Sequence, residues 1–169
     1  RICANLKVER AAIYGFRSVQ RLLQGAPLAE VWQFYLAARD SARAATYATN
    51  TYYPTDVSLW VPADLLEKAD WNDEQRAELV ADIWDALERV DSDQLDIDQR
   101  EQFEKRRFKV GQTLNHEELQ EDSLRVLQAS GSRAGFFLYA RSIGGLAFGH
   151  EKLEDVHIKS AEEAATYLE

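Results

Sequence analysis

The sequence of 169 residues contains no methionine, one cysteine and three prolines. The single cysteine, Cys3, excludes an internal disulfide framework and a cysteine-rich zinc site. Three prolines and 8 glycines are too few for a collagen-like chain or a flexible linker. Because methionine is absent and residue 1 is arginine, we expect residues 1–169 to be a single region that forms a fragment of a longer chain.

Long apolar runs are also absent. The nearest candidate, residues 134–149, is rich in glycine and interrupted by Arg141, and it falls short of the roughly 18 apolar residues that a membrane span needs. No apolar stretch near the N-terminus is typical of a secretory signal. We therefore expect a cytoplasmic protein without membrane contacts.

Charge is plentiful but uneven. The chain has 20 Lys and Arg against 29 Asp and Glu, a net charge of -9, which argues against a nucleic-acid-binding domain. Residues 1–43 nevertheless carry seven basic and three acidic residues, whereas residues 70–104 carry 13 acidic and three basic ones. The basic N-terminal region and the acidic middle of the chain could therefore contact each other, either within one chain or head-to-tail between two chains. The 4 Trp, 7 Tyr and 7 Phe argue against disorder.

Apolar residues recur at helical spacing through most of the chain, and no segment alternates with the period of a strand. The pattern predicts an all-α protein with helices that begin near residues 8, 28, 55, 73, 99, 116, 133 and 161. In the first helix the expected inward face consists of five residues: Val8, Ala12, Phe16, Val19 and Leu23.

Local signals mark several helix ends. The stretch ending at Pro54 breaks the pattern, and Pro62 is expected to bend the following helix because proline removes a helix hydrogen bond. Asn72, three residues before Gln75, predicts a capped helix start, and Asn115 before Glu118 predicts another.

Paired helices beginning at residues 8, 55, 99 and 133 are separated by 47, 44 and 34 residues, which is in the range of helical-hairpin repeats. Such hairpins bury their apolar faces by stacking on their neighbours. The sequence therefore favours antiparallel hairpins stacked as a short α-solenoid, and the alternative is a globular multi-helix bundle.

Gly15, Val19, Leu22 and Pro27 resemble the second helix of a tetratricopeptide repeat, and residues 134–139 resemble its tightly packed helices. Residues 53–67 and 71–88 resemble degenerate repeats of large bacterial signalling or defence proteins. The opening tryptophan-leucine-glycine-tyrosine pattern of the family is missing. The resemblance implies stacked hairpins and a sensor or scaffold role, but it transfers no ligand-binding residue.

A row of basic and aromatic residues on the first expected helix is the main candidate binding site. Arg10, Tyr14, Arg17 and Arg21 recur at intervals of four, three and four and share one helix face. Arginine and tyrosine are favoured at interaction hot spots. The alternatives are a solvated face or pairing with acidic helices of the same protein.

A second candidate is the basic run Lys105, Arg106, Arg107 and Lys109, which directly follows the acidic middle of the chain. Its side chains are expected to form intramolecular salt bridges or, as the alternative, to contact phosphate or RNA.

Metal sites and catalytic centres are not expected. The aspartates between residues 91 and 98 fail the EF-hand pattern, because Leu95 occupies the fifth position and Asp96 replaces the glycine. His116 lacks the second histidine of a zinc-protease motif, and His150 and His157 have no cysteine nearby. Cys3 has no visible base partner. We therefore expect no metal, cofactor or catalytic residue.

The sequence thus predicts a non-catalytic helical-repeat region that binds a protein or peptide, as a sensor or scaffold of a multidomain protein. Two alternatives stay open. The helices can serve as a structural or self-association module of the parent chain, or they can bind nucleic acid through the arginine row of the first helix.

Overall fold

The computed structural model describes residues 2–49 and 52–130. This part of the chain forms six α-helices and one short 3-10 helix and contains no strand, which confirms the all-α prediction. The elements are α1 (Ile2–Leu23), α2 (Leu28–Thr49), α3 (Tyr52–Lys68), α4 (Asp73–Glu88), η1 (Ser92–Gln94), α5 (Ile97–Leu114) and α6 (Glu117–Ala129).

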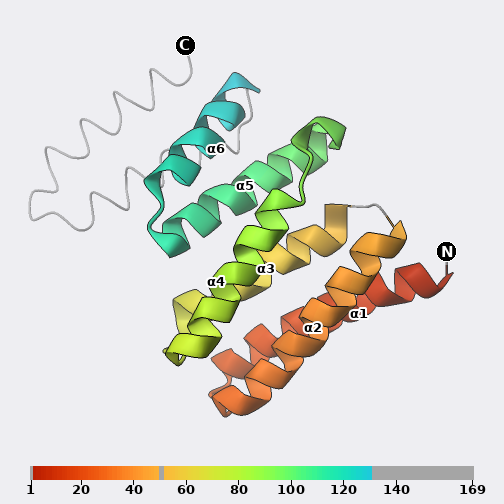
Figure 1. Cartoon of the computed structure of the whole chain (residues 1–169), viewed down its shortest axis with the longest axis vertical. Helices are drawn as coiled ribbons and strands as arrows, with labels where there is room; N and C mark the ends of the chain where they lie inside the picture. Colours follow the sequence, from red (N-terminus) through yellow and green to blue (C-terminus); the bar gives the residue numbers. More distant parts are fainter. Residues whose placement is uncertain (1, 50–51, 131–169) are drawn as a thin grey trace, which may run out of the picture.

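The helices pair as three antiparallel hairpins, α1/α2, α3/α4 and α5/α6, which follow one another along the long axis of the molecule (Figure 1). Between hairpins, α3 contacts both α1 and α2 on one side and α5 on the other. The hairpins therefore stack in sequence order, and α1, α3 and α5 lie next to one another.

The repeat length differs from that of the family suggested by the sequence. The first helices of the three hairpins begin at residues 2, 52 and 97, so the repeats are longer than the roughly 34 residues of a tetratricopeptide unit. The stacked hairpins are established, but their identity as a tetratricopeptide-like solenoid is not. The helices expected from residues 133 and 161, and residues 134–139, lie outside the described residues.

The main core lies between the first two hairpins. The buried face of α2 comprises Val31, Tyr35, Ala38, Ala42 and Ala45. Its alanines allow neighbouring helices to approach closely. From α4, Leu79 and Ile83 complete this core, and Trp71 closes its end with its indole N–H donating to the carbonyl oxygen of Leu65 at 2.8 Å.

The predicted inward face of α1 is wrong in part, because Phe16 and Leu23 are exposed. The buried residues are instead Ala11, Gly15 and Ser18. A Cβ atom on Gly15 would lie 2.8 Å from Cγ2 of Val61 on α3. Small side chains therefore set the approach of α1 to α3. Val19 and Leu22 pack against the core beside them, whereas Phe16 and Leu23 are exposed.

Pro54 of α3 acts differently from expectation. The helix begins at Tyr52, so Pro54 lies in its first turn instead of breaking the pattern. Proline is tolerated there, since the first N–H groups of a helix have no internal acceptor. Pro62 lies inside the helix and is fully buried.

The helix caps confirm one prediction and correct another. Asn72 caps α4 as predicted, its side chain accepting from the Gln75 N–H at 2.8 Å. Asn115 is not an N-cap, because it ends α5 in the left-handed conformation with φ of 53°. His116 takes that role for α6, and its Nδ1 accepts from the backbone N–H of Leu119 at 3.3 Å.

Candidate functional site

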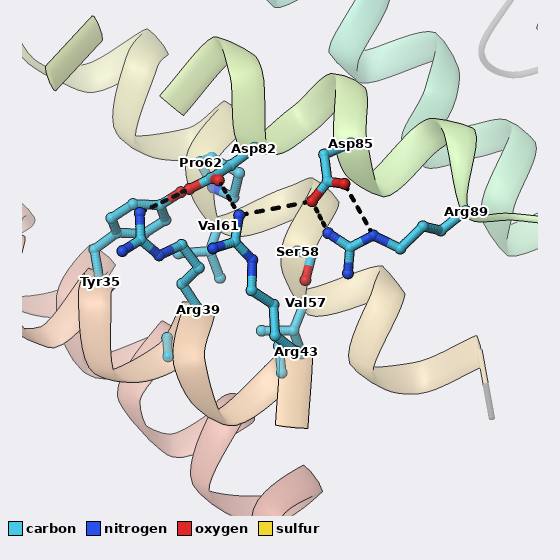
Figure 2. A pocket seen from close by; sticks show the side chains of 12 residues that line it. Tyr35, Arg39, Arg43, Val57, Ser58, Val61, Pro62, Asp82, Asp85 and Arg89 are labelled. Atoms are coloured by element: carbon cyan, nitrogen blue, oxygen red, sulfur yellow. Dashed lines mark hydrogen bonds and ion pairs between the residues drawn. The ribbon is translucent and has the colours of Figure 1, made fainter. Parts of the chain in front are cut away.

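A charged cleft lies where α2 of the first hairpin meets α3 and α4 of the second (Figure 2). Its polar lining comes mainly from α2 and α4, while α3 supplies apolar side chains such as Val57, Val61 and Pro62. The cleft is shallow, because a water-sized molecule finds only about 10 Å³ of room in it, which is about the space that one water needs.

Asp82 of α4 is the centre of this cleft and is largely buried. Its carboxylate accepts a short hydrogen bond from the hydroxyl of Tyr35 and a 2.7 Å bond from Arg43 Nη2, and Arg39 Nη1 lies 3.4 Å away. Burial, followed by the neighbouring Asp82 charge, raises the pKa of Tyr35 well above its ordinary value. The phenol therefore stays protonated and donates to the carboxylate.

The other charges of the cleft are paired as well. Asp85 pairs with Arg89 and lies 3.6 Å from Arg43 (Figure 2). Glu78 pairs with Arg39. Each arginine of the cleft thus has at least one carboxylate partner, and the buried Nε of Arg39 has no hydrogen-bond partner. The Ser58 hydroxyl donates to a carbonyl oxygen one turn earlier in its own helix, at 3.2 Å, and has no adjacent base. The arrangement ties the first hairpin to the second by charge.

A second buried carboxylate ties the second hairpin to the third. Asp56 of α3 accepts from Arg106 Nε at 2.8 Å and from Gln102 Nε2 at 3.2 Å, both on α5. The Tyr52 hydroxyl lies 3.4 Å from the same carboxylate. Both hairpin junctions thus contain a buried aspartate with one tyrosine and at least one arginine.

The basic run that the sequence singled out makes intramolecular ion pairs throughout. Besides Arg106, Lys105 pairs with Glu101 at 2.6 Å and Lys109 with Glu67 of α3 at 2.6 Å. The Arg107 guanidinium lies 3.5 Å from the buried carboxylate of Glu104 and 3.4 Å from that of Asp122 on α6. Arg106 and Lys109 therefore hold α5 to α3, and Arg107 holds α5 to α6, whereas the pair of Lys105 lies within α5.

The arginine row of α1 is divided between two environments. Arg21 makes a bidentate ion pair with Glu30 of α2, in which Nε donates to Oε1 at 2.8 Å and Nη2 donates to Oε2 at 3.1 Å. The guanidinium of Arg17 lies 4.9 Å from the centre of the Phe34 ring, and the Tyr14 ring stacks on the same phenylalanine at 6.5 Å. Arg10 and Arg17 are exposed, whereas Tyr14 and Arg21 are half-buried against α2.

Beside this row lies an apolar surface that sequence analysis missed, here called the α1 seam. It consists of Leu6, Ile13, Phe16 and Leu23, with exposed fractions of 53%, 60%, 62% and 68%. The Phe16 ring packs on Trp60 of α3, with centroids 4.9 Å apart. The intervals of seven, three and seven residues between these four side chains can be read in the sequence. A buried helix face shows the same intervals, so the spacing alone does not indicate exposure.

The unpaired positive charge of the described chain gathers beside the seam. Among the described Lys and Arg side chains, four have no carboxylate within 4.0 Å, namely Lys7, Arg10, Arg17 and Arg76. Three of these four lie on α1, and only Arg76 lies elsewhere, on α4.

Metal and membrane sites find no support in the described residues. No three His, Cys, Asp or Glu side chains converge there as ligands. In the acidic connection, Asp91 and Asp96 cap η1 and α5, and Asp93 pairs with Arg100. Of the helices in the described ranges, none combines the length and hydropathy that crossing a bilayer requires. His150 and His157 lie outside the described residues.

No protein-family model matches the chain, and neither a curated protein nor a solved structure matches it.

Proposed function

We propose that the protein is a non-catalytic helical interaction module and that it binds a protein or peptide partner through the α1 seam. The observation that carries this proposal is the exposure of four large apolar side chains along one side of a single helix. Large apolar side chains gathered on one exposed helix face mark interaction sites more often than single scattered ones do. The exposed Glu9 and Gln20 lie between them on the same face.

The form of the seam supports a helical or extended partner. From Leu6 to Leu23 it spans about 25 Å at the rise of an α-helix. Phe16 and Trp60 form an aromatic pair at the junction with α3, and aromatic side chains are favoured as hot spots of binding. Arg10 and Arg17, predicted as partner-binding residues, border the same surface.

The charged cleft supports a structural role and not a catalytic one. Its arginines and carboxylates neutralise one another, its hydroxyl groups donate within the protein, and its free volume is about that of one water. A substrate would have to break ion pairs that join two hairpins. This favours an interaction or scaffold role over an unrecognised enzyme.

Selection from a random peptide display library on the immobilised protein tests the proposal. We expect the enriched peptides to lose binding to the Ile13→Asp variant, because a carboxylate in the centre of the seam is costly to desolvate. The matched control is Ile97→Asp, since Ile97 is 84% exposed on α5 and far along the chain from the seam. Peptides that bind both variants and the parent protein equally would contradict the proposal.

A further inference from the structure

We propose that the partner of the α1 seam is an amphipathic helix whose apolar face is bordered by acidic residues. This inference rests on the proposed function and adds the chemistry of the partner to it. It follows from the seam and from the charges that surround it on α1.

The first step concerns the apolar pattern. Leu6, Ile13, Phe16 and Leu23 are separated by seven, three and seven residues and fall on the a and d positions of one heptad register. The two remaining a and d positions of that register, Glu9 and Gln20, are polar and exposed, so the apolar face is interrupted at these two places. At 100° per residue these side chains cover an arc of about 100°, the width of an apolar helix face. A straight partner helix of about five turns matches the length of the seam.

The second step concerns charge. Arg10 and Arg17 lie four residues after Leu6 and Ile13, at the position that follows the seam on its α2 side. Lys7 lies farther round the same side. In coiled coils the charges beside the apolar positions choose the partner, so this border favours carboxylates on the facing helix. Glu9 is the one acidic side chain on the described part of α1, and it lies on the seam itself, three residues after Leu6 and four before Ile13. The three unpaired cations of α1 outnumber it.

The protein does not supply these carboxylates from its own neighbouring helices. On α3, Asp56 is already paired with Arg106, Asp64 with Lys68 and Glu67 with Lys109. On α2, Glu30 is paired with Arg21. The positive border of α1 therefore remains available in a chain whose net charge is -9.

A second copy of α1 fits the border less well. In an antiparallel pair of α1 helices, the Arg10 and Arg17 row of one copy would face the same row of the other. Like charges at the flanking positions of a helix pair are destabilising. The charge pattern thus favours a different, acidic helix over a symmetric dimer.

Two labelled synthetic helices test this inference by fluorescence anisotropy. Both are about three heptads long with leucine at each a and d position, and they differ only in having glutamate or lysine at the flanking positions. We expect the glutamate peptide to bind about tenfold more tightly at low salt, because each exposed ion pair contributes a few-fold at most. The preference should shrink as added salt screens the charges.

Charge-reversal variants show which side chains cause the preference for the glutamate peptide. The double variant Lys7→Glu and Arg10→Glu is expected to abolish or reverse the preference, because it replaces two unpaired cations without breaking an ion pair of the fold. Arg76→Glu is the matched control, since Arg76 is also unpaired but lies on α4, and it should leave the preference unchanged.

Three outcomes would overturn the inference. If both peptides bind alike and both lose binding to Ile13→Asp, the seam binds helices without regard to charge, and the proposed function stands. If neither peptide binds, the acidic helix is not the partner, while library selection still decides the proposed function. If sedimentation velocity shows a dimer that Ile13→Asp dissociates and Ile97→Asp does not, the occupant is a second copy.

Discussion

Replacing Asp82 by alanine is expected to destabilise the protein more than any other single change in the charged cleft. The carboxylate is largely buried and joins α4 to α2 through Tyr35, Arg39 and Arg43. The substitution leaves the Tyr35 hydroxyl, which lies on the buried face of α2, without its acceptor. A buried hydroxyl without a partner costs about 1–3 kcal/mol.

The two arginines add a smaller amount. Arg39 keeps its pair with Glu78, and the side chain of Arg43 is 40% exposed, so its loss of a partner is screened by water. Together these effects predict a loss of about 3 kcal/mol in the free energy of unfolding. Asp82→Asn keeps an acceptor oxygen for Tyr35 and is expected to lose about half as much.

Equilibrium unfolding in urea measures the effect. At a slope of about 2 kcal/mol per molar, the midpoint of Asp82→Ala falls by about 1.5 M. Asp85→Ala is the control, because its side chain is 46% exposed and its pairs are surface pairs worth less than about 1 kcal/mol. An Asp82→Ala midpoint within 0.3 M or so of the parent value, or equal to that of Asp85→Ala, would refute the view that this carboxylate joins the hairpins.

Three further predictions follow from the packing of α1, α3, α5 and α6. Gly15→Ala should lower the unfolding free energy by about 1 kcal/mol in spite of alanine's better helix propensity, because the new Cβ overlaps Val61. If the variant is more stable than the parent in urea unfolding, the close approach of α1 and α3 is contradicted. Arg106→Met should cost about 2 kcal/mol in the same assay by leaving a buried carboxylate of α3 without its guanidinium, whereas Lys105→Met should cost less than about 0.5 kcal/mol. Burial raises the pKa of Glu104 above 4.5, against the opposing effect of its hydrogen-bonding neighbours, so the folded chain keeps this proton to a higher pH than the unfolded chain. The parent protein should therefore lose stability relative to Glu104→Gln as the pH rises from about 4.5 through the raised pKa of Glu104. Urea midpoints of the two proteins at successive pH values measure this. A stability difference between them that does not change with pH would contradict the raised pKa.

The helices themselves could be predicted from the sequence, because their signals are local. The buried face of α2 follows from alanines and large residues at helical spacing, and the Asn72 cap follows from a residue type at one position. The stacked hairpins follow from the spacing of the helix starts. Neither result depends on knowing which helices meet.

The orientation of α1 could not be predicted, because two of its faces are plausible cores. Val8, Ala12, Phe16, Val19 and Leu23 form the more apolar face, and hydrophobic periodicity alone selects it. The structure buries the face with smaller side chains, because close packing against α3 favours them. A helix with small residues on one side and large apolar residues on another can bury either side. This pattern in the sequence would have indicated that the side with small residues could be the buried one.

The burial of the two aspartates could not be predicted from the sequence either. Asp56 and Asp82 look like solvated acidic residues, since charge along a helix is usually exposed. Their partners on other helices lie between 39 and 50 residues away in the sequence, so only the tertiary structure brings them together. For the same reason Arg106 and Lys109 could not be assigned to their carboxylates on α3, whereas the Lys105–Glu101 pair, at a spacing of four residues in one helix, is a local signal.

Photo-cross-linking tests the central claim, that the α1 seam binds an acidic amphipathic helix, most directly. A benzophenone amino acid in place of Ile13 places the reactive group in the middle of the seam, and the same residue in place of Ile97 is the exposed control on α5. We predict that irradiation with the glutamate peptide gives a covalent adduct at position 13 and none at position 97, and that unlabelled glutamate peptide competes it away. Equal adducts at both positions, or none at position 13, would contradict the account.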